Sequence, residues 1–235
     1  MPATRRAAGF TLIELAVVTA IIALLLGGLL VPLANQVELS EVREAEDDLA
    51  EIRDAIFGFA MVNDRLPCPD CAAAGGDCAA GEVNDGIGDP NPMAAGNSCD
   101  TDWGNVPWSD LGTPENDPWG ERYYYKVTDS FANMEVGGAV SFNLTDNGDI
   151  TVEETNGGND IATQVPALVL STGPNAYDAT EVQSTDEVSN VNNADSTFVS
   201  KDVIKGGEAT EFDDLVIWIS PFVLKKRMVD VEKLP

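Results

Sequence analysis

The sequence has no histidine among its 235 residues. Histidine is the commonest general base near neutral pH and the commonest metal ligand, so its absence excludes the usual histidine-dependent enzymes and histidine-based zinc sites. Catalysis would have to rely on carboxylates, lysine, tyrosine or cysteine, and the sequence shows no nucleophile–base pattern among them. We therefore expect a protein that is not an enzyme and that requires no cofactor.

Basic residues are also scarce, because 13 lysines and arginines stand against 40 aspartates and glutamates, for a formal net charge of -27. A field of this sign opposes non-specific binding to nucleic acids and to anionic membrane surfaces. A short basic run, Lys225-Lys226-Arg227, suggests DNA capture, but it is too small to reverse this field. A nucleic-acid partner is therefore not expected.

Charged residues are missing altogether between Leu15 and Val37. An apolar run of about 20 residues is long enough to cross a bilayer as a helix. Arg5 and Arg6 precede the run and acidic residues follow it, which places the N-terminus in the cytoplasm and the rest of the chain outside. We therefore expect a single-pass inner-membrane protein with a periplasmic head.

Three other interpretations of the N-terminus compete with this one. A secretory signal needs a cleavage site of small residues, for which Pro32-Leu33-Ala34 is a poor match. Arg5-Arg6 suggests a twin-arginine signal, but Ala7-Ala8-Gly9 does not continue that pattern. A plain membrane anchor gives no reason for Glu14, a carboxylate at the edge of the apolar run. Glu14 is therefore the residue that an interpretation has to explain.

The stretch from Gly9 to Leu15 reads Gly-Phe-Thr-Leu-Ile-Glu-Leu. It resembles the processing site of type IV prepilins and of the pseudopilins of type II secretion. The resemblance implies that a prepilin peptidase removes a leader of residues 1–9 by cutting between Gly9 and Phe10, and that it methylates the new N-terminus. It also implies that Glu14 pairs with the N-terminal amine of a neighbouring subunit, which would supply the missing partner of this carboxylate.

The function that this resemblance implies is that of a structural subunit of a type IV pilus or of a type II secretion pseudopilus. Its partners would be other pilin-like subunits, the prepilin peptidase and the inner-membrane assembly platform, and assembly would carry it into a filament or to the cell surface. A cysteine-rich head favours a minor or specialised subunit. The alternative is a membrane-anchored extracytoplasmic binding protein that does not polymerise.

A second helical pattern follows the apolar run. Apolar residues recur at spacings of three and four, which predicts one apolar stripe on an amphipathic helix. The members of this stripe are Leu39, Val42, Ala45, Leu49, Ile52, Ile56 and Phe59. We expect a stalk helix over 37–63 that continues a membrane and assembly helix over 10–36 without a break, followed by a head over 64–235.

Residues 66–121 are rich in glycine, proline, asparagine and aspartate, and they predict a long irregular region. It carries the four cysteines of the chain, Cys68, Cys71, Cys78 and Cys99. Disulfides persist outside the cytoplasm, and we favour the pairs Cys68–Cys99 and Cys71–Cys78 among the three possible pairings. A redox-active Cys68-x-x-Cys71 pair and a four-cysteine zinc site are the alternatives.

The remainder of the head predicts strands. Runs at 122–128, 165–171 and 215–219 have strand composition, and the second is apolar on both faces, which favours a central position. An Asn147-Gly148 turn between 139–144 and 150–152 predicts a hairpin. A short helix should follow Ser220-Pro221, and the polar stretch 173–200 predicts an exposed loop. The expected class is α+β, a pilin fold in which the long helix packs on an antiparallel sheet.

Major pseudopilins hold calcium in a loop near the end of the chain, and the resemblance implies a similar site at Asn175, Asp213 and Asp214. Calcium takes oxygen ligands, which this part of the chain supplies. Asp213 and Asp214 are adjacent in the run from Phe212 to Trp218, which resembles the closing strand of pilin-like proteins. In a strand they would point to opposite faces, which makes them a poor catalytic pair. A second calcium candidate is the stretch from Asn84 to Asp89, although it lacks EF-hand spacing.

Overall fold

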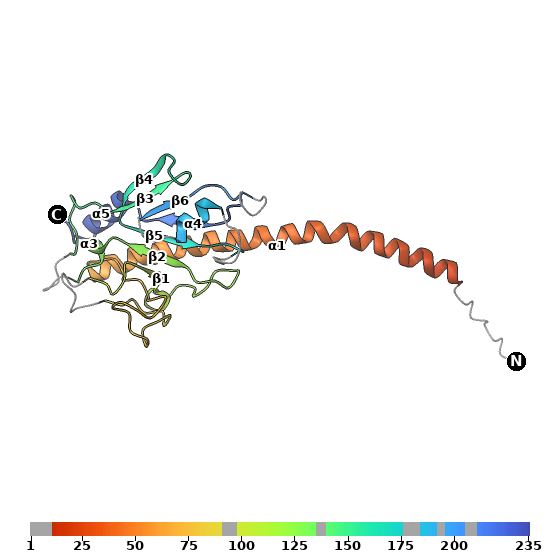
Figure 1. The fold of residues 1–235 in the computed structure, drawn as a ribbon, viewed down its shortest axis with the longest axis horizontal. Coiled ribbons are helices and arrows are strands. Elements are labelled where there is room, and N and C mark those ends of the chain that lie inside the picture. The colour runs from red at the N-terminus through yellow and green to blue at the C-terminus, as the bar shows by residue number, and fades with distance from the viewer. Residues whose placement is uncertain (1–10, 91–97, 135–139, 176–183, 192–195, 205–210) are drawn as a thin grey trace. The chain divides into compact units, whose positions relative to one another are not determined.

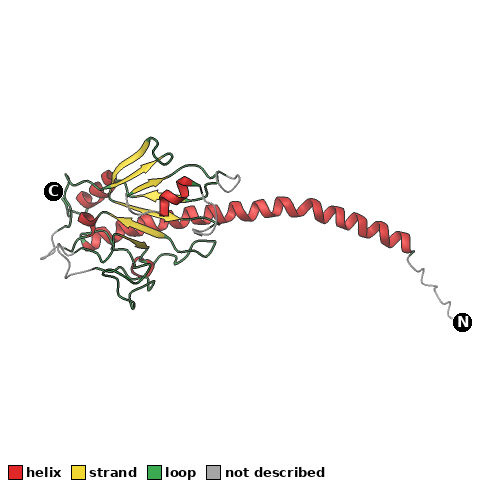
Figure 2. Ribbon diagram, in the orientation of Figure 1, coloured by secondary structure: helices red, strands yellow, loops and turns green. Residues whose placement is uncertain are grey.

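A computed structural model of the chain describes residues 11–90, 98–134, 140–175, 184–191, 196–204 and 211–235, and for 26–35 it describes the backbone alone. The chain divides into two compact units, Met1–Arg43 and Glu44–Pro235. Strands occur within the second unit, and Figure 2 shows them in yellow.

The helix α1 (Leu12–Asn63) runs for 52 residues and ends where the sequence predicts. Asp64 follows with a φ of 62°, a left-handed conformation that stops the helix. Leu49, Ile52 and Ile56 are buried, as predicted for the stripe. Leu39 is 56% exposed, so the prediction of a buried Leu39 is wrong, and Phe57 rather than Phe59 completes the buried stripe.

A four-stranded antiparallel sheet forms the centre of the second unit. Its order is β1 (Trp103–Asn105), β2 (Tyr124–Val127), β5 (Ala167–Ser171) and β7 (Leu215–Trp218). All five residues of β5 are buried between β2 and β7, which confirms its predicted central position. Figure 1 shows these strands beside the later part of α1.

The two faces of this sheet pack against different partners, because successive strand residues point to opposite sides. On β5, Val169 belongs to one core cluster with Ile52 and Ile56 of α1. Leu168 and Leu170 belong to a second cluster that contains residues of a smaller sheet. The second unit therefore has three layers, with the central sheet between helix α1 and the smaller sheet.

The smaller sheet has the order β4 (Asp160–Val165), β3 (Ile150–Glu153), β6 (Thr197–Val199). Strand β3 pairs antiparallel with β4 and parallel with β6, so the prediction of an antiparallel head is corrected here. The predicted hairpin through Asn147-Gly148 is wrong, because residues 140–144 form no strand. Gly148 instead allows its own segment to approach the end of β4 closely, since a Cβ there would lie 2.0 Å from the Val165 carbonyl oxygen.

Four short helices complete the described part of the chain. They are α2 (Trp108–Leu111), α3 (Asp129–Ala132), α4 (Thr185–Val191) and α5 (Pro221–Asp230). Helix α5 begins with Pro221 at its first position and buries Leu224 and Met228 in the core, as the Ser220-Pro221 signal predicts. Helix α4 and strand β6 correct the prediction that 173–200 is simply an exposed loop, because Asn190 and Phe198 are fully buried.

Candidate functional site

The start of α1 has a reciprocal cap between Thr11 and Glu14. The Thr11 amide N–H and the Thr11 hydroxyl each donate to Glu14 Oε2 at 2.9 Å, and the Glu14 amide N–H donates to Thr11 Oγ1 at 3.3 Å. This is the Thr-x-x-Glu capping box, which satisfies amide groups that the first helical turn leaves without partners. The pattern is readable in the sequence, but the sequence analysis missed it.

The apolar side chains around Glu14 are exposed. Ile13, Val17 and Val18 line a shallow surface together with Glu14, and Ile13 is 73% exposed. Further along the first unit, Leu24 is 79% exposed. Burial of such surface away from water is favourable, so this part of the helix is suited to contact an apolar partner. Gly9 and Phe10, the predicted processing residues, lie outside the described residues.

Residues 4–30 match a protein family described as the prokaryotic N-terminal methylation motif. The chain carries a prepilin-type methylation motif. This motif marks substrates of prepilin peptidase of the pilin or pseudopilin type, and it implies assembly with pilin-like subunits. Neither a characterised protein nor a solved structure was found to match the chain.

The motif is typical of membrane-anchored pilins. Among the residues described here, however, no helix combines the length and apolar character that crossing a membrane requires. The membrane span over residues 10–36 remains a prediction.

The predicted calcium ligands Asp213 and Asp214 belong to a buried group of acidic residues in the head. Asp213 and Asp214 are 6% and 4% exposed, and Glu187 of α4 is 3% exposed. Asn175 Nδ2 donates to Glu187 Oε1 at 3.4 Å, while Asn190 Nδ2 donates to Asp214 Oδ2 at 2.7 Å. The sequence analysis missed Glu187, because it lies in a polar stretch that gave no sign of burial.

Both aspartates precede β7 instead of lying within a strand, so the expectation that strand alternation separates them does not apply. Burial and the charges of Glu187 and Glu211 raise the pKa of Asp213 to about 7. Burial and the charges of Glu187 and Asp213 raise the pKa of Asp214 well above its ordinary value. Asp213 Oδ1 is buried and has no hydrogen-bond partner within the described part of the chain.

The cysteines form the two disulfides that we favoured, Cys68–Cys99 and Cys71–Cys78. No free cysteine remains, which rules out the alternative four-cysteine zinc site in this structure. It also leaves Cys68-x-x-Cys71 without the internal bond that a redox-active pair would form. The two disulfides anchor the irregular region within the head, since Cys68, Cys71 and Cys99 are all buried.

The basic run at the end of the chain is engaged within the head. Lys225 Nζ donates to the carbonyl oxygens of Leu144 and Asp146. Lys226 pairs with Asp230 one helical turn away, and the Arg227 guanidinium lies 4.2 Å from the centre of the Phe57 ring. These contacts give the three cations structural partners, which weighs further against DNA capture.

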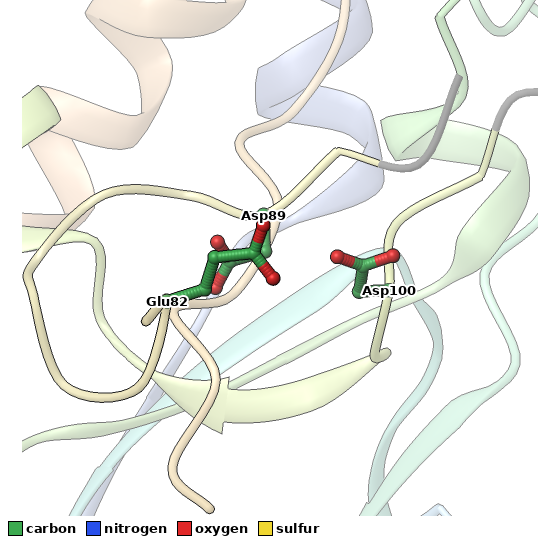
Figure 3. A group of neighbouring side chains, drawn as sticks. All are labelled: Glu82, Asp89 and Asp100. Carbon is green, nitrogen blue, oxygen red and sulfur yellow. The ribbon is translucent and has the colours of Figure 1, made fainter. Parts of the chain in front are cut away.

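One group of acidic side chains in the described residues has the close spacing of metal ligands. Glu82, Asp89 and Asp100 each offer a carboxylate oxygen, and these oxygens lie within 4.8 Å of one another (Figure 3). Asp89 ends the Asn84 to Asp89 stretch, which the sequence analysis named as a calcium candidate. Asp213 and Asp214 are not part of a group with such spacing.

Proposed function

We propose that this chain is a structural subunit, minor or specialised, of a type IV pilus or a type II secretion pseudopilus, with a pilin fold. The observation that carries the proposal is the methylation motif over residues 4–30, which includes the first part of the 52-residue helix α1. The head supports it, since α1 packs on an antiparallel sheet. Catalysis has no place in the proposal, because the chain lacks histidine.

Before assembly, residues 10–36 hold the subunit in the inner membrane and the head faces the periplasm. The absence of charge from Leu15 to Val37 supports this placement. Prepilin peptidase removes residues 1–9 and methylates the new N-terminus at Phe10. The assembly platform then moves the subunit into a filament, where the exposed apolar side chains of the first unit contact other pilin-like subunits.

Glu14 sets the register of assembly by pairing with the N-terminal amine of a neighbouring subunit. The capping box supports this role, because it holds the Glu14 carboxylate next to the backbone of Thr11, close to the chain start that cleavage creates. In the isolated chain, this carboxylate already accepts two hydrogen bonds from Thr11. A charged amine of a neighbour offers a stronger, charge-assisted donor.

Calcium binding at Asn175, Asp213 and Asp214 forms a second part of the proposal. A cation there would neutralise carboxylates that are now buried together, and it would give Asp213 Oδ1 a partner. Glu187 adds a third buried carboxylate to the same group of acidic residues. We expect added calcium to raise the unfolding temperature of the chelator-treated full-length protein. In Asp213→Asn the increase should be smaller, because this pair of aspartates would no longer bind the ion.

The deciding experiment is the intact mass of the protein extracted from membranes of its native host, with and without the prepilin peptidase. We expect a peptidase-dependent loss of residues 1–9 together with an added methyl group. An uncut chain in both strains would overturn the proposal in favour of a membrane-anchored binding protein that does not polymerise. Cleavage near Ala34 would instead indicate an ordinary exported protein in which Glu14 has no role.

A further inference from the structure

The disulfide region folds back on itself around residues 68–71. The Asp89 amide N–H donates to the Pro69 carbonyl oxygen at 3.2 Å, and the Asp100 amide N–H donates to the Asp89 carbonyl oxygen at 2.9 Å. A Cβ at Gly88 would lie 2.6 Å from the Cys68 carbonyl oxygen, so only glycine allows this close approach. The Cys68–Cys99 disulfide then holds Asp100 beside the same turn.

This folding gathers carboxylates from separate positions. The ligand oxygens of Glu82, Asp89 and Asp100 lie within 4.8 Å of one another, and Figure 3 shows Glu82 and Asp89 side by side with Asp100 on a neighbouring stretch of chain. Asp89 is 6% exposed, and its Oδ2 accepts the Cys71 amide N–H at 2.8 Å. Glu82 Oε2 accepts the Ala79 amide N–H at 2.9 Å. These bonds fix the two side chains in place.

An additional carboxylate, that of Asp70, lies fully buried against the same turn. Its Oδ2 accepts the Gly86 amide N–H at 3.0 Å, while Asp89 is held by the amide of the next residue, Cys71. The two side chains are thus anchored across the same pair of segments. Asp70 Oδ1 is buried and has no hydrogen-bond partner among the residues described. A buried acceptor of this kind is costly unless a cation or donor satisfies it.

The charges that act on Asp89 are negative. Asp89 is buried, and the carboxylates of Asp70, Asp85 and Glu82 lie near enough to repel its charge. Arg122 attracts Asp70, but its guanidinium is paired with Glu115 at 2.7 Å. Like charges in a buried place favour either a proton or a bound cation.

We propose that Glu82, Asp89 and Asp100 form a divalent cation site that suits calcium, with the buried carboxylate of Asp70 anchored to the same turn. Calcium accepts irregular sets of carboxylate and carbonyl oxygens, whereas magnesium demands a near-octahedral arrangement. The cysteines of the chain are all oxidised and histidine is absent, so the donors suit a hard cation and not zinc. The bound ion would tie the turn at residues 82–89 to the segment that follows Cys99.

This site is separate from the acidic group of Asp213, Asp214 and Glu187. The proposal does not depend on the filament role of the chain. The test is calcium binding to the chelator-stripped full-length protein in detergent, by equilibrium dialysis and calorimetry, for the wild type and three variants. Asp89→Asn removes a ligand charge and keeps an acceptor for the Cys71 amide. Asp77→Asn, at an exposed position between the paired Cys71 and Cys78, makes the same charge change outside the cluster. Asp213→Asn tests calcium binding at the acidic group around Asp213.

We expect Asp89→Asn to weaken one class of calcium sites by about tenfold or more, while Asp77→Asn leaves binding unchanged. If Asp89→Asn fails to fold, Glu82→Gln gives the same test, because glutamine keeps an acceptor for the hydrogen bond that Glu82 accepts from the Ala79 amide. No calcium binding up to about millimolar concentrations would overturn the proposal. Binding that is equal in wild type, Asp89→Asn and Glu82→Gln would also overturn it, whichever result Asp213→Asn gives.

Discussion

The two parts of helix α1 share one backbone geometry and differ in what they do with apolar side chains. In the first unit, Leu12 and Leu24 are 89% and 79% exposed, whereas in the second unit Ile52 and Ile56 are fully buried. The buried part contributes to the free energy of unfolding of the head. The exposed part finds no partner in its own unit among the described side chains. The contrast assigns stability to the second unit and association to the first.

Glu14→Ala tests the association that we propose for the first unit, and it has the largest expected effect. We expect incorporation into filaments to fall by at least about tenfold, because a neighbour's amine loses its partner. Cleavage after Gly9 and the unfolding temperature of the head should stay unchanged, since the Glu14 carboxylate is hydrogen-bonded to Thr11 at the start of α1. Mass spectrometry of sheared filaments and calorimetry would measure these quantities.

Glu14→Gln is the matched control for that experiment. Glutamine also fits the third position of a capping box, so it keeps the local cap and removes the charge. We expect it to lose incorporation as Glu14→Ala does. Normal incorporation of Glu14→Gln would show that capping, and not the charge, is what assembly needs.

Ile52→Ala tests the other side of the comparison. Because Ile52 is fully buried in the core cluster, the substitution should lower the free energy of unfolding by about 2–5 kcal/mol. Leu39→Ala, at a 56% exposed position of the same helix, should change it by less than about 0.5 kcal/mol. Denaturant titration of the full-length protein measures both, and equal effects would contradict the division of roles.

The disulfides should contribute unequally to the head. Loss of Cys68–Cys99, which closes 31 residues, should cost about 4 kcal/mol, and loss of Cys71–Cys78, which closes 7, about 2 kcal/mol. The paired serine variants of each disulfide would be compared by denaturant titration. A larger cost for the short loop would show that native contacts, not chain entropy, dominate.

The smallest expected effect is on pH dependence. The folded state raises the pKa of Asp213 to about 7 and that of Asp89 to about 6, so it holds protons that the unfolded chain releases near pH 4. With a chelator present, their contribution to stability is therefore complete below about pH 4 and is lost as the pH rises to about 7. Melting curves should show a fall of a few degrees over this window.

Asp213→Asn is expected to flatten that pH profile, since asparagine does not titrate. Asp77→Asn removes a carboxylate at an exposed position and should leave the profile unchanged. An unfolding temperature that rises with pH over the same window would contradict the cause given for both shifts.

Much of the fold could be predicted where neighbouring residues alone specify the local structure. Helix α1 ends at Asn63 as predicted, β5 and β7 lie within the predicted runs, and Pro221 begins α5. Each of these depends on local periodicity or on a residue with a restricted backbone. The hairpin predicted at Asn147-Gly148 is wrong, because an Asn-Gly pair can also stand where glycine allows a close approach of the backbone, as Gly148 does. The turn that joins β3 to β4 contains Asn156-Gly157 instead.

The N-terminal motif and the long helix could be predicted from the sequence, because both are properties of neighbouring residues. Which acidic residues meet depends on how distant segments pack. Glu82 joins Asp100 through a disulfide and a glycine that permits a close turn, and Glu187 joins Asp213 through a helix in a polar stretch. A charge shows in the sequence, but whether it is solvated or buried beside another depends on contacts between distant parts of the chain.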